Sequence, residues 1–304
     1  MNEPAPDSTV PVSVAQQLEA QFGALQSVVE IAGGDINRAA QVAVGGENIF
    51  VKWNENAPSD LFEVEARGLE MLRAANALRV PQVLAIGEQF LALEYIGEGI
   101  IFNRDEWSKR FAEGLATQHR CLAPDAQFGL EASSYLGLMP QQNTPTTSWP
   151  HFWRNCRLAP QIDFARERGI GEERLRLLDE IQNRIEQLLD YNARPSLLHG
   201  DLWSGNYLAA SASAVLVDPA IYYGDREAEL GYIELFGGFP ANFVAHYNAA
   251  WPLEDGYEQR RPVHQLYYLL AHFNLFGEPY GQTVERVCRQ ILERHGKATN
   301  SLTV

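Results

Sequence analysis

One stretch in the second half of the chain constrains this sequence more than any other. Residues 199–218 begin with His-Gly-Asp-Leu-Trp-Ser-Gly-Asn and end with Val-Leu-Val-Asp. The stretch places two carboxylates and an amide, Asp201, Asn206 and Asp218, at fixed offsets. The apolar run before Asp218 suits a short strand, and the glycines before Asn206 suit a turn. We therefore expect the three side chains to meet at one site.

This spacing is typical of a phosphotransferase. In protein kinases, the Asp that accepts the substrate hydroxyl proton precedes an Mg²⁺-binding Asn by five residues, and a later Asp binds the magnesium that bridges the ATP phosphates. Asp201 and Asn206 have the same offset, and Asp218 stands where the later Asp would be. We predict Asp201 as the catalytic base and Asn206 with Asp218 as Mg²⁺ ligands. An isolated His-Gly-Asp or Asp-Pro pair would be an ordinary turn, so further parts of such a site are required upstream.

Two of those parts are a lysine on a strand and an acid on a helix. Residues 41–53 have the pattern of a β-hairpin with a Gly-Gly turn, which places Lys52 on the second strand, where its ammonium can reach the α- and β-phosphates of ATP. Residues 61–72 have apolar side chains at helical spacing, and Glu65 lies on the apolar side. A buried Lys–Glu pair costs desolvation free energy, and orienting ATP is a use that justifies it.

Two further segments are expected to contact the nucleotide. Gly33 and Gly34 can bring backbone N–H groups close to phosphate, although a plain turn is the alternative for so short a motif. Glu94, Tyr95 and Ile96 lie at the end of an apolar strand that runs into a glycine before a new helix. We expect this segment to be a hinge between lobes whose backbone groups pair with the adenine edge.

Together these motifs resemble the fructosamine-3-kinase (ketosamine-3-kinase) family, which has the aminoglycoside-phosphotransferase-like, protein-kinase-like fold. The most specific parts are Leu-Trp-Ser-Gly-Asn in the catalytic stretch and Tyr-Gly-Asp-Arg-Glu at 223–227. The resemblance implies an enzyme that uses ATP and Mg²⁺ to phosphorylate the sugar 3-hydroxyl of ketosamines. These are fructosamine, ribulosamine or erythrulosamine adducts on amino acids or protein lysines. It further implies a role in deglycation repair.

Several residues near these motifs are candidates for other roles. Trp203 either faces the substrate sugar or packs in the core, and Tyr222 and Tyr223 are weaker candidates for the substrate wall. His199 is expected to hold the catalytic loop rather than to act as a base. Arg226 is expected to pair with a neighbouring carboxylate and brace the nearby loop.

Two alternative functions stay open at the level of the sequence. The first is a kinase of the same fold that acts on an aminoglycoside, a choline-like compound or another amino alcohol. The second is a nucleotide-binding scaffold without catalytic activity. The scaffold is disfavoured because all five expected active-site residues are present, namely Lys52, Glu65, Asp201, Asn206 and Asp218.

The order of patterns predicts an α+β, bilobal protein-kinase-like fold. Residues 1–97 are expected to form a strand-rich nucleotide-binding lobe, in which a helix at 12–22 precedes the strands. Residues 98–304 are expected to form a helical catalytic and substrate-binding lobe, in which 135–153 is a loop. Helices in this lobe are predicted at 107–121 with Asp105 as cap, 172–191, 227–236, 262–276 and 283–295.

Charge and cysteine content limit the partners and the compartment. The net charge of −15 argues against nucleic acid or an anionic membrane as a partner, and suits a cationic sugar amine. The three cysteines show no C-x-x-C spacing, which favours reduced thiols in a cytoplasm over a disulfide framework or a zinc site. We find no signal-peptide pattern, and no apolar run approaches the roughly 20 residues of a membrane span. The expected location is therefore cytoplasmic.

Overall fold

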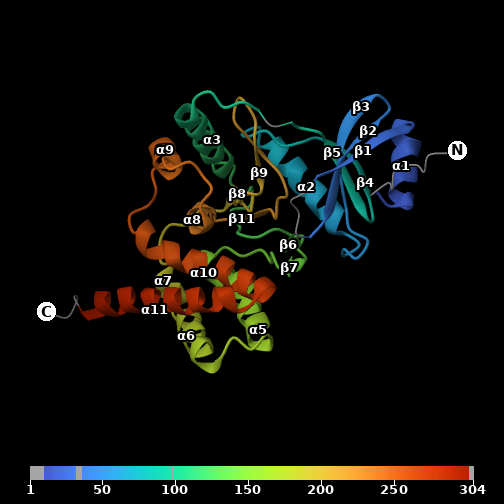
Figure 1. The fold of residues 1–304 in the computed structure, drawn as a ribbon. Helices are drawn as coiled ribbons and strands as arrows, with labels where there is room; N and C mark the ends of the chain where they lie inside the picture. The colour runs from blue at the N-terminus through green and yellow to red at the C-terminus, as the bar shows by residue number, and fades with distance from the viewer. Residues whose placement is uncertain (1–9, 32–35, 98, 301–304) are drawn as a thin grey trace.

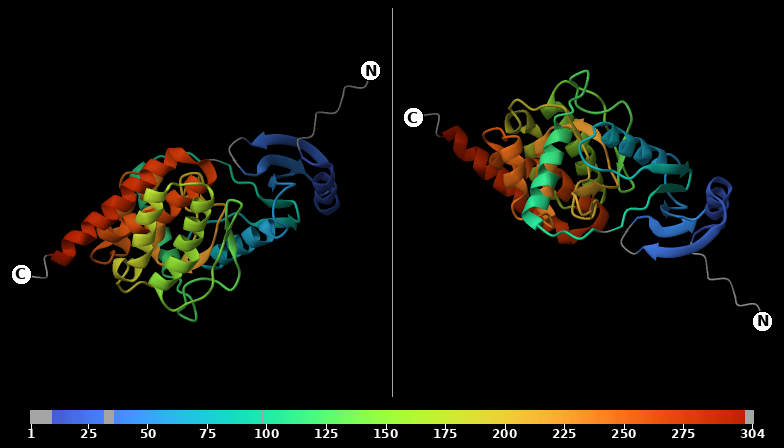
Figure 2. Two further views of the ribbon diagram at one scale, coloured as in Figure 1. Left: turned by 90° about the horizontal axis from the view of Figure 1, so that it is seen from below. Right: turned by 90° about the horizontal axis from the view of Figure 1, so that it is seen from above.

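The computed structural model describes residues 10–31, 36–97 and 99–300, which form two lobes (Figure 1). A five-stranded sheet dominates the N-terminal lobe, and helices dominate the C-terminal lobe. Views from below and above show the same separation (Figure 2). The chain passes between them after Glu94, the end of the last sheet strand, and before Arg104, the start of the next helix. This arrangement confirms the predicted α+β bilobal fold.

The N-terminal lobe is an antiparallel sheet with one helix before it and one within it. Neighbouring strands in the sheet follow the order β1-β2-β3-β5-β4. Its strands are β1 (Leu25–Ile31), β2 (Arg38–Val44), β3 (Glu47–Trp53), β4 (Val83–Gly87) and β5 (Phe90–Glu94). Its helices are α1 (Val12–Phe22) and α2 (Leu61–Ala74). The predicted helix at 12–22 and the hairpin within 41–53 are both confirmed.

Alternation along β3 decides which side chain reaches the active site. Val51 and Trp53 belong to the buried cluster on the side of α1, which also contains Val14 and Leu18. Successive side chains on a strand point to opposite faces, so Lys52 points toward α2. A one-residue shift in the pairing of β3 would bury the ammonium under α1 instead.

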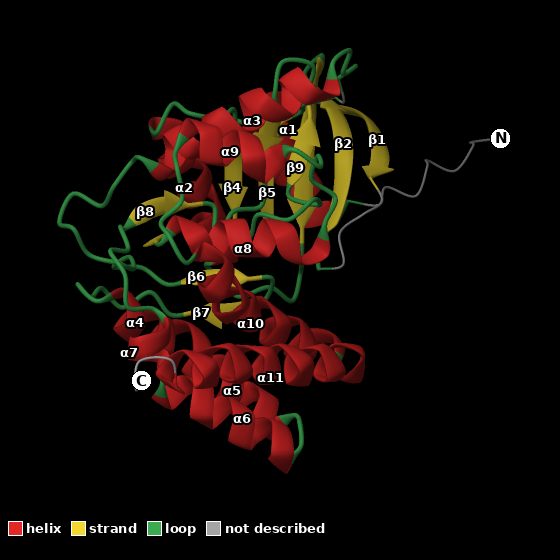
Figure 3. Cartoon of the chain, turned by 90° about the vertical axis from the view of Figure 1, so that its left-hand side faces the viewer, coloured by secondary structure: helices red, strands yellow, loops and turns green. Residues whose placement is uncertain are grey.

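The described part of the C-terminal lobe consists of helices and six short strands, which pair in three two-stranded sheets. Its helical segments are α3 (Arg104–His119), α4 (Trp149–Phe152), the π-helical η1 (Trp153–Leu158), α5 (Ala159–Glu167), α6 (Glu172–Asn183), α7 (Ile185–Leu188), α8 (Arg226–Phe236), α9 (Phe243–Ala250), α10 (Tyr257–Phe276) and α11 (Glu278–Asn300). Its strands are β6 (Ser134–Leu136), β7 (Met139–Gln141), β8 (Ser196–Leu198), β9 (Tyr207–Ala209), β10 (Ala214–Leu216) and β11 (Tyr222–Gly224). Helix α10 packs against α11 and α8 (Figure 3). Within the described residues, no helix is both long enough and apolar enough to cross a bilayer.

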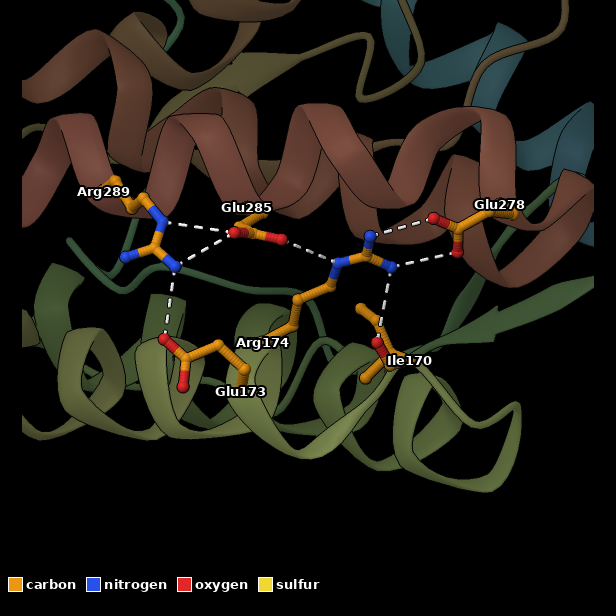
Figure 4. A network of polar contacts seen from close by, with 6 residues as sticks. All are labelled: Ile170, Glu173, Arg174, Glu278, Glu285 and Arg289. Carbon is orange, nitrogen blue, oxygen red and sulfur yellow. Dashed lines mark hydrogen bonds and ion pairs between the residues drawn. The ribbon is translucent and has the colours of Figure 1, made fainter.

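An ion-pair network holds α11 against α6 (Figure 4). The Arg174 guanidinium donates to both carboxylate oxygens of Glu278, each at 2.9 Å, and to Glu285 at 3.3 Å. Arg289 contacts Glu285 at 3.0 Å and Glu173 at 3.2 Å. Arg174 is largely buried, and its fork-shaped contact with Glu278 is the kind of ion pair that fixes geometry. The network therefore sets the position of the start of α11.

Several predicted helix boundaries were wrong: α10 begins at 257 instead of 262, and α11 runs from 278 to 300 instead of 283 to 295. Two further differences have a local reason. Helix α3 begins at Arg104, because the Asn103 side chain accepts the N–H groups of Asp105 and Glu106, each at 3.1 Å. Asp105 was predicted as the cap but lies in the first turn, where its charge complements the helix dipole. The helix predicted at 172–191 is interrupted at Arg184, which separates α6 from α7.

The segment predicted as a loop, 135–153, is mostly structured. It contains the β6–β7 hairpin and then α4, which begins at a Ser148 side-chain cap. The hairpin reaches the other lobe, since the Tyr135 hydroxyl donates to the Asp60 carboxylate at 2.6 Å, just before α2. At its base, Gln141 donates to the carbonyl of Ala220 at 3.2 Å. The insert therefore joins α2 to the segment that follows Asp218.

Candidate active site

Lys52 lies between two carboxylates contributed by different lobes. Its ammonium forms an ion pair with Glu65 of α2 and with Asp218 at 2.6 Å. The predicted pairing of Lys52 with Glu65 is therefore present. Lys52 and Glu65 are buried, whereas the Asp218 side chain is 49% exposed. Glu65 contacts the ammonium on its buried side, and the Asp218 carboxylate lies on the side that is open to solvent.

The surroundings shift the pKa values of these three groups in different directions. Burial raises the pKa of Glu65 to about 7, although the Lys52 ammonium opposes the shift. Burial alone would lower the pKa of Lys52, but the Asp218 and Glu65 carboxylates raise it above its ordinary value. The dense surroundings of Asp218 would raise its pKa, and the Lys52 ammonium overrides them and holds it below the ordinary value. Asp218 and Lys52 are therefore ionised at neutral pH.

A short hairpin explains how residues twelve positions apart come together. Strands β9 and β10 pair antiparallel, with Tyr207 opposite Leu216, and the Val217 N–H donates to the Asn206 carbonyl at 3.1 Å. Asn206 therefore lies beside the end of the strand that precedes Asp218. Asp218 itself has φ +56°, a left-handed conformation that Asp tolerates better than most residues. The sharp turn directs the carboxylate to Lys52.

Asn206 fixes the position of the Asp201 carboxylate. Its Nδ2 group donates to the Asp201 carbonyl at 2.8 Å and to Asp201 Oδ2 at 2.9 Å. Both partners can only accept, so the amide nitrogen has to face Asp201 and Oδ1 has to face away. Asn206 therefore orients Asp201 with its nitrogen and keeps an oxygen for another ligand.

Asp201 has the acidity of a group that can accept a proton near neutral pH. Burial raises the pKa of its carboxyl to about 7, while hydrogen bonds from Tyr232 and Asn206 act in the opposite direction. The Tyr232 hydroxyl donates to Asp201 Oδ1 at 3.2 Å. A general base is most effective when its pKa lies near the working pH. The geometry therefore gives a positioned carboxylate whose protonation changes in the physiological range.

His199 holds the loop, as predicted. Its ring Nε2 donates to the Val217 carbonyl at 2.8 Å, and its Nδ1 accepts the Asp201 N–H at 3.3 Å. Burial lowers the pKa of His199, so the ring is neutral and ties the catalytic loop to the strand before Asp218. The next residue, Gly200, has φ +85°, and a Cβ there would lie 2.0 Å from the Ala220 carbonyl oxygen. No other residue fits this position without moving the loop.

Helix α8 supports the loop through residues that we did not predict. The Glu229 carboxylate is fully buried and accepts the Gly200 N–H at 2.7 Å and a hydrogen bond from His119 at 2.8 Å. Burial would raise the pKa of Glu229, but the hydrogen bond and charge of His119 hold it below its ordinary value. Tyr232 lies one turn further along α8. The sequence does contain a signal for Glu229, which stands between Ala228 and Leu230 in a predicted helix. If this segment is buried, its carboxylate requires polar partners.

In the segment predicted as the hinge, residues 94–96, the role of Glu94 differs from that of Tyr95 and Ile96. The Glu94 carboxylate accepts the Gln82 N–H at 3.2 Å and pairs with Arg79 at 2.5 Å. Its side chain therefore braces the end of β5. Among the described residues, the backbone groups of Tyr95 and Ile96 make no hydrogen bond to other backbone groups. The predicted phosphate contacts of Gly33 and Gly34 lie outside the described residues.

The three aromatic residues proposed for the substrate wall lie in different places. Trp203 is 40% exposed beside the catalytic loop. Tyr222 is fully buried, with the Arg157 guanidinium 3.9 Å from its ring centroid, so it has no surface for a substrate and this part of the prediction was wrong. Tyr223 is partly buried, and its side chain packs against the hydrophobic cluster that Cys121 also contacts.

The predicted role of Arg226 also differs from the structure. Its guanidinium donates to the backbone carbonyls of Trp251 at 2.9 Å and Pro252 at 2.5 Å, and it lies 3.8 Å from the Trp251 ring centroid. The neighbouring Glu227 pairs with Arg260 at 2.6 Å instead. Arg226 therefore fixes the segment after α9, and Arg260 supplies the buried ion pair.

Comparison with known sequences identifies the family. The family model described as fructosamine kinase matches residues 9–294. The chain belongs to the fructosamine kinase family. It is 37% identical over 300 residues to a probable ketoamine kinase of Synechocystis sp., covering 96% of this chain and 99% of that protein. It is 37% identical over 274 residues to a probable ketoamine kinase of Lactiplantibacillus plantarum, covering 88% and 94%.

Solved structures agree with this membership in the fructosamine kinase family. The structure of a protein assigned as a fructosamine-3-kinase of Thermobifida fusca superposes with a TM-score of 0.84 at 33% identity, covering 92% of this chain and 99% of that chain. An aminoglycoside phosphotransferase in complex with AMP-PNP and hygromycin B has a TM-score of 0.63 at 18% identity, covering 93% and 98%. The second similarity shows the shared kinase-like fold. As a member of a kinase family with this fold, the protein is an ATP-dependent phosphotransferase.

The donor set of this fructosamine kinase family member fits Mg²⁺. Asn206 Oδ1 and the Asp218 carboxylate are hard oxygen donors, and Asp218 is accessible to solvent. Among the described residues, no group of three or more His, Cys, Asp or Glu side chains forms a metal cluster. Mg²⁺ prefers one or two protein ligands together with phosphate and water, so two oxygens beside an ATP site are a suitable set. A zinc-type site would need more protein ligands.

Proposed function

We propose that this protein is a ketosamine 3-kinase, which transfers the γ-phosphoryl group of ATP to the sugar 3-hydroxyl of fructosamine or ribulosamine adducts. The acceptors are adducts on free amino acids or on protein lysines, and the role is deglycation repair in the cytoplasm. The observation that carries the proposal is the position of Asp201, held by Tyr232 and Asn206 next to the Lys52–Asp218 pair. The family membership and the names of its relatives support the choice of a ketosamine.

In this proposal, the protein provides positioning and one proton acceptor. Asp201 accepts the proton of the attacking hydroxyl through a carboxylate oxygen. Asn206 and Tyr232 keep that carboxylate in one orientation, so it is already positioned when the hydroxyl binds. Lys52 orients the phosphates, and Glu65 holds Lys52 in place. Phosphoryl transfer depends mostly on such positioning and on charge.

Asn206 and Asp218 would hold Mg²⁺ in this proposal. Held there, the ion would supply positive charge against the phosphates and against the charge that develops during transfer. The chain itself brings a net charge of −15, so Lys52 and the bound ion together would offset the repulsion of ATP. On the other side of the nucleotide, backbone groups of Tyr95 and Ile96 are proposed to bind the adenine edge, and Gly33 and Gly34 the phosphates.

Trp203 is the proposed contact for the sugar. It belongs to the same loop as Asp201, and its exposed surface is available beside the acceptor position. A ring face there can cover the apolar side of a sugar or attract the ammonium of a ketosamine. Tyr222 and Tyr223 are not part of this proposal.

The experiment that tests the function is ATP consumption by the purified protein with a panel of acceptors. The panel contains fructosyl-lysine, ribulosyl-lysine, aminoglycosides and choline, and product mapping by NMR locates the phosphate. We expect turnover on the ketosamines with phosphate on the 3-hydroxyl. Phosphate on an aminoglycoside or choline hydroxyl, with inert ketosamines, would overturn the substrate and leave the kinase in place. No turnover on any acceptor, despite binding of ATP, would favour the scaffold alternative.

A further inference from the structure

An aromatic strip leads away from the catalytic loop across three helices. We define it by the rings of Phe236 at the end of α8, His272 and Phe276 in the last turns of α10, and Tyr280 near the start of α11. The ring centroids of Phe236 and His272 are 4.4 Å apart, those of His272 and Tyr280 5.1 Å, and those of Phe276 and Tyr280 6.0 Å. The four rings therefore form a continuous surface.

The strip begins at the acceptor side of the active site. The Tyr232 hydroxyl donates to Asp201, and the Tyr232 and Phe236 rings meet edge to face at 5.9 Å. Tyr232 is held rigidly, because its ring stacks on Tyr268 at 3.7 Å. Gly238, two residues after the end of α8, also lies close to the loop that carries Asp201, since a Cβ on Gly238 would lie 2.4 Å from the side chain of Ser204. A molecule that places a hydroxyl at Asp201 can therefore extend over the strip.

The strip is accessible and has little free charge. Phe236 is 38% exposed and Phe276 is 52% exposed, and each ring contacts the His272 ring between them, at 4.4 Å and 5.7 Å, so two exposed apolar side chains belong to one surface. The neighbouring carboxylate, Glu278, is bound at both oxygens by Arg174 (Figure 4). The strip lies on the Asp201 side, whereas ATP is expected on the side of Lys52 and Asp218. The chemistry of this surface therefore fits the apolar part of the acceptor rather than the nucleotide.

We propose that the strip binds the carrier of the ketosamine, the stem attached to its amine, and that it selects an uncharged aliphatic stem such as the methylene chain of a lysine. This inference rests on the proposed function. In a ketosamine the nitrogen is on C1, two carbons from the carbon that bears the 3-hydroxyl. When the 3-hydroxyl meets Asp201, the nitrogen lies a few ångströms away at the start of the strip. The stem then extends over Phe236 toward Phe276, and contact with these rings removes its methylene groups from water.

The test is a series of fructosamines whose amine bears a methyl, butyl or hexyl group. In the wild-type protein we expect KM to fall roughly twofold per methylene that is half covered, or about tenfold from methyl to butyl, at constant KM for ATP. The double variant Phe236→Ala/Phe276→Ala should lose this dependence on stem length and leave the methyl compound nearly unaffected. The matched control is Phe164→Ala, since Phe164 lies on α5, is 39% exposed and is not one of the residues that define the strip.

The outcomes separate the inference from the function on which it rests. A KM that falls with stem length in the wild type and the control, and not in the double variant, supports the strip as the stem subsite. Equal KM values for all three compounds in every protein would overturn the strip and leave the ketosamine kinase standing. Absence of turnover on all three compounds would overturn both. The single variant Phe276→Ala, at the more exposed position, gives the same decision with half of the effect if the double variant folds poorly.

Discussion

The two halves of the proposed active site are built by different means. On the nucleotide side, Lys52, Glu65 and Asp218 form a compact group of charges in contact with one another. On the acceptor side, the Asp201 carboxylate is held by neutral donors, Tyr232 and the Asn206 amide. One half depends on ion pairs between lobes, and the other on hydrogen bonds within one lobe.

This difference separates binding from chemistry. A charged group that spans both lobes is suited to a ligand that also spans them, as ATP does in kinases. Burial raises the pKa of the Asp201 carboxyl to about 7, and the hydrogen bonds from its neutral donors Tyr232 and Asn206 oppose this shift only in part. We therefore expect substitutions in the two halves to give separable effects, and the following predictions test that separation.

The largest effect is expected at Asp201. The substitution Asp201→Asn keeps the shape of the side chain and removes the proton acceptor, so kcat should fall by at least ~10²-fold, the scale of general-base effects. Thermal stabilisation by Mg·ATP should remain, because the nucleotide half is intact. Turnover is measured with the preferred ketosamine, and stabilisation by thermal unfolding. A folded variant with near-normal kcat would remove Asp201 from the role of base.

A smaller effect, on binding, is expected at Asp218. We choose Asp218→Asn, because Asn also tolerates the left-handed conformation at φ +56°. Loss of the charge should weaken Mg·ATP about tenfold, which reduces the stabilisation by saturating ligand by roughly 1.4 kcal/mol. The matched control is Asp179→Asn, since that side chain is 51% exposed and pairs with Arg166. If both variants respond to Mg·ATP like the wild type, the nucleotide does not bind at Asp218.

The smallest effect is a shift in pH dependence at Tyr232. Asp201 has to be deprotonated to accept a proton, so kcat/KM should rise with pH through an apparent pKa near 7. The Tyr232 hydrogen bond lowers the pKa of Asp201, and Tyr232→Phe removes it, so the rising limb should move to higher pH while the plateau changes little. The control Tyr207→Phe removes a hydroxyl that donates to a backbone carbonyl, that of Gly238. A limb that stays in place in Tyr232→Phe would mean that another group titrates.

The nucleotide half could be predicted from the sequence because charge restricts its neighbours. Strand alternation and helical spacing placed Lys52 and Glu65 on facing sides, and only one arrangement of a buried cation and a carboxylate avoids a large desolvation cost. The positions of Asp201 and Asn206 followed from a fixed offset along one loop. Local periodicity and offset are properties of the sequence itself, so these parts needed no tertiary information.

The acceptor half depended on packing between distant segments, which periodicity does not contain. Tyr222 and Tyr223 are neighbours in sequence, but the pleat of β11 turns them to opposite faces, and Tyr222 is fully buried whereas Tyr223 is partly buried. Glu229 contacts Gly200 because α8 packs beneath the catalytic loop, 29 residues away in the sequence. The partner of Arg226 was missed for the same reason, since its acceptors are backbone carbonyls that any sequence supplies.

The insert that joins the lobes has a consequence for control of the enzyme. In protein kinases, activity is switched by moving the helix that contributes the glutamate partner of the lysine. Here the corresponding helix, α2, is fastened to the C-terminal lobe on both sides of Glu65. Asp60 accepts the hydrogen bond of Tyr135, and a Cβ on Gly68 would lie only 3.1 Å from the ring of Pro219. Outward movement of α2 would break the Tyr135 hydrogen bond and separate Gly68 from Pro219, so both contacts favour the position in which Glu65 pairs with Lys52. The two contacts therefore oppose the helix movement that switches protein kinases, and they lie on either side of the residue that pairs with Lys52.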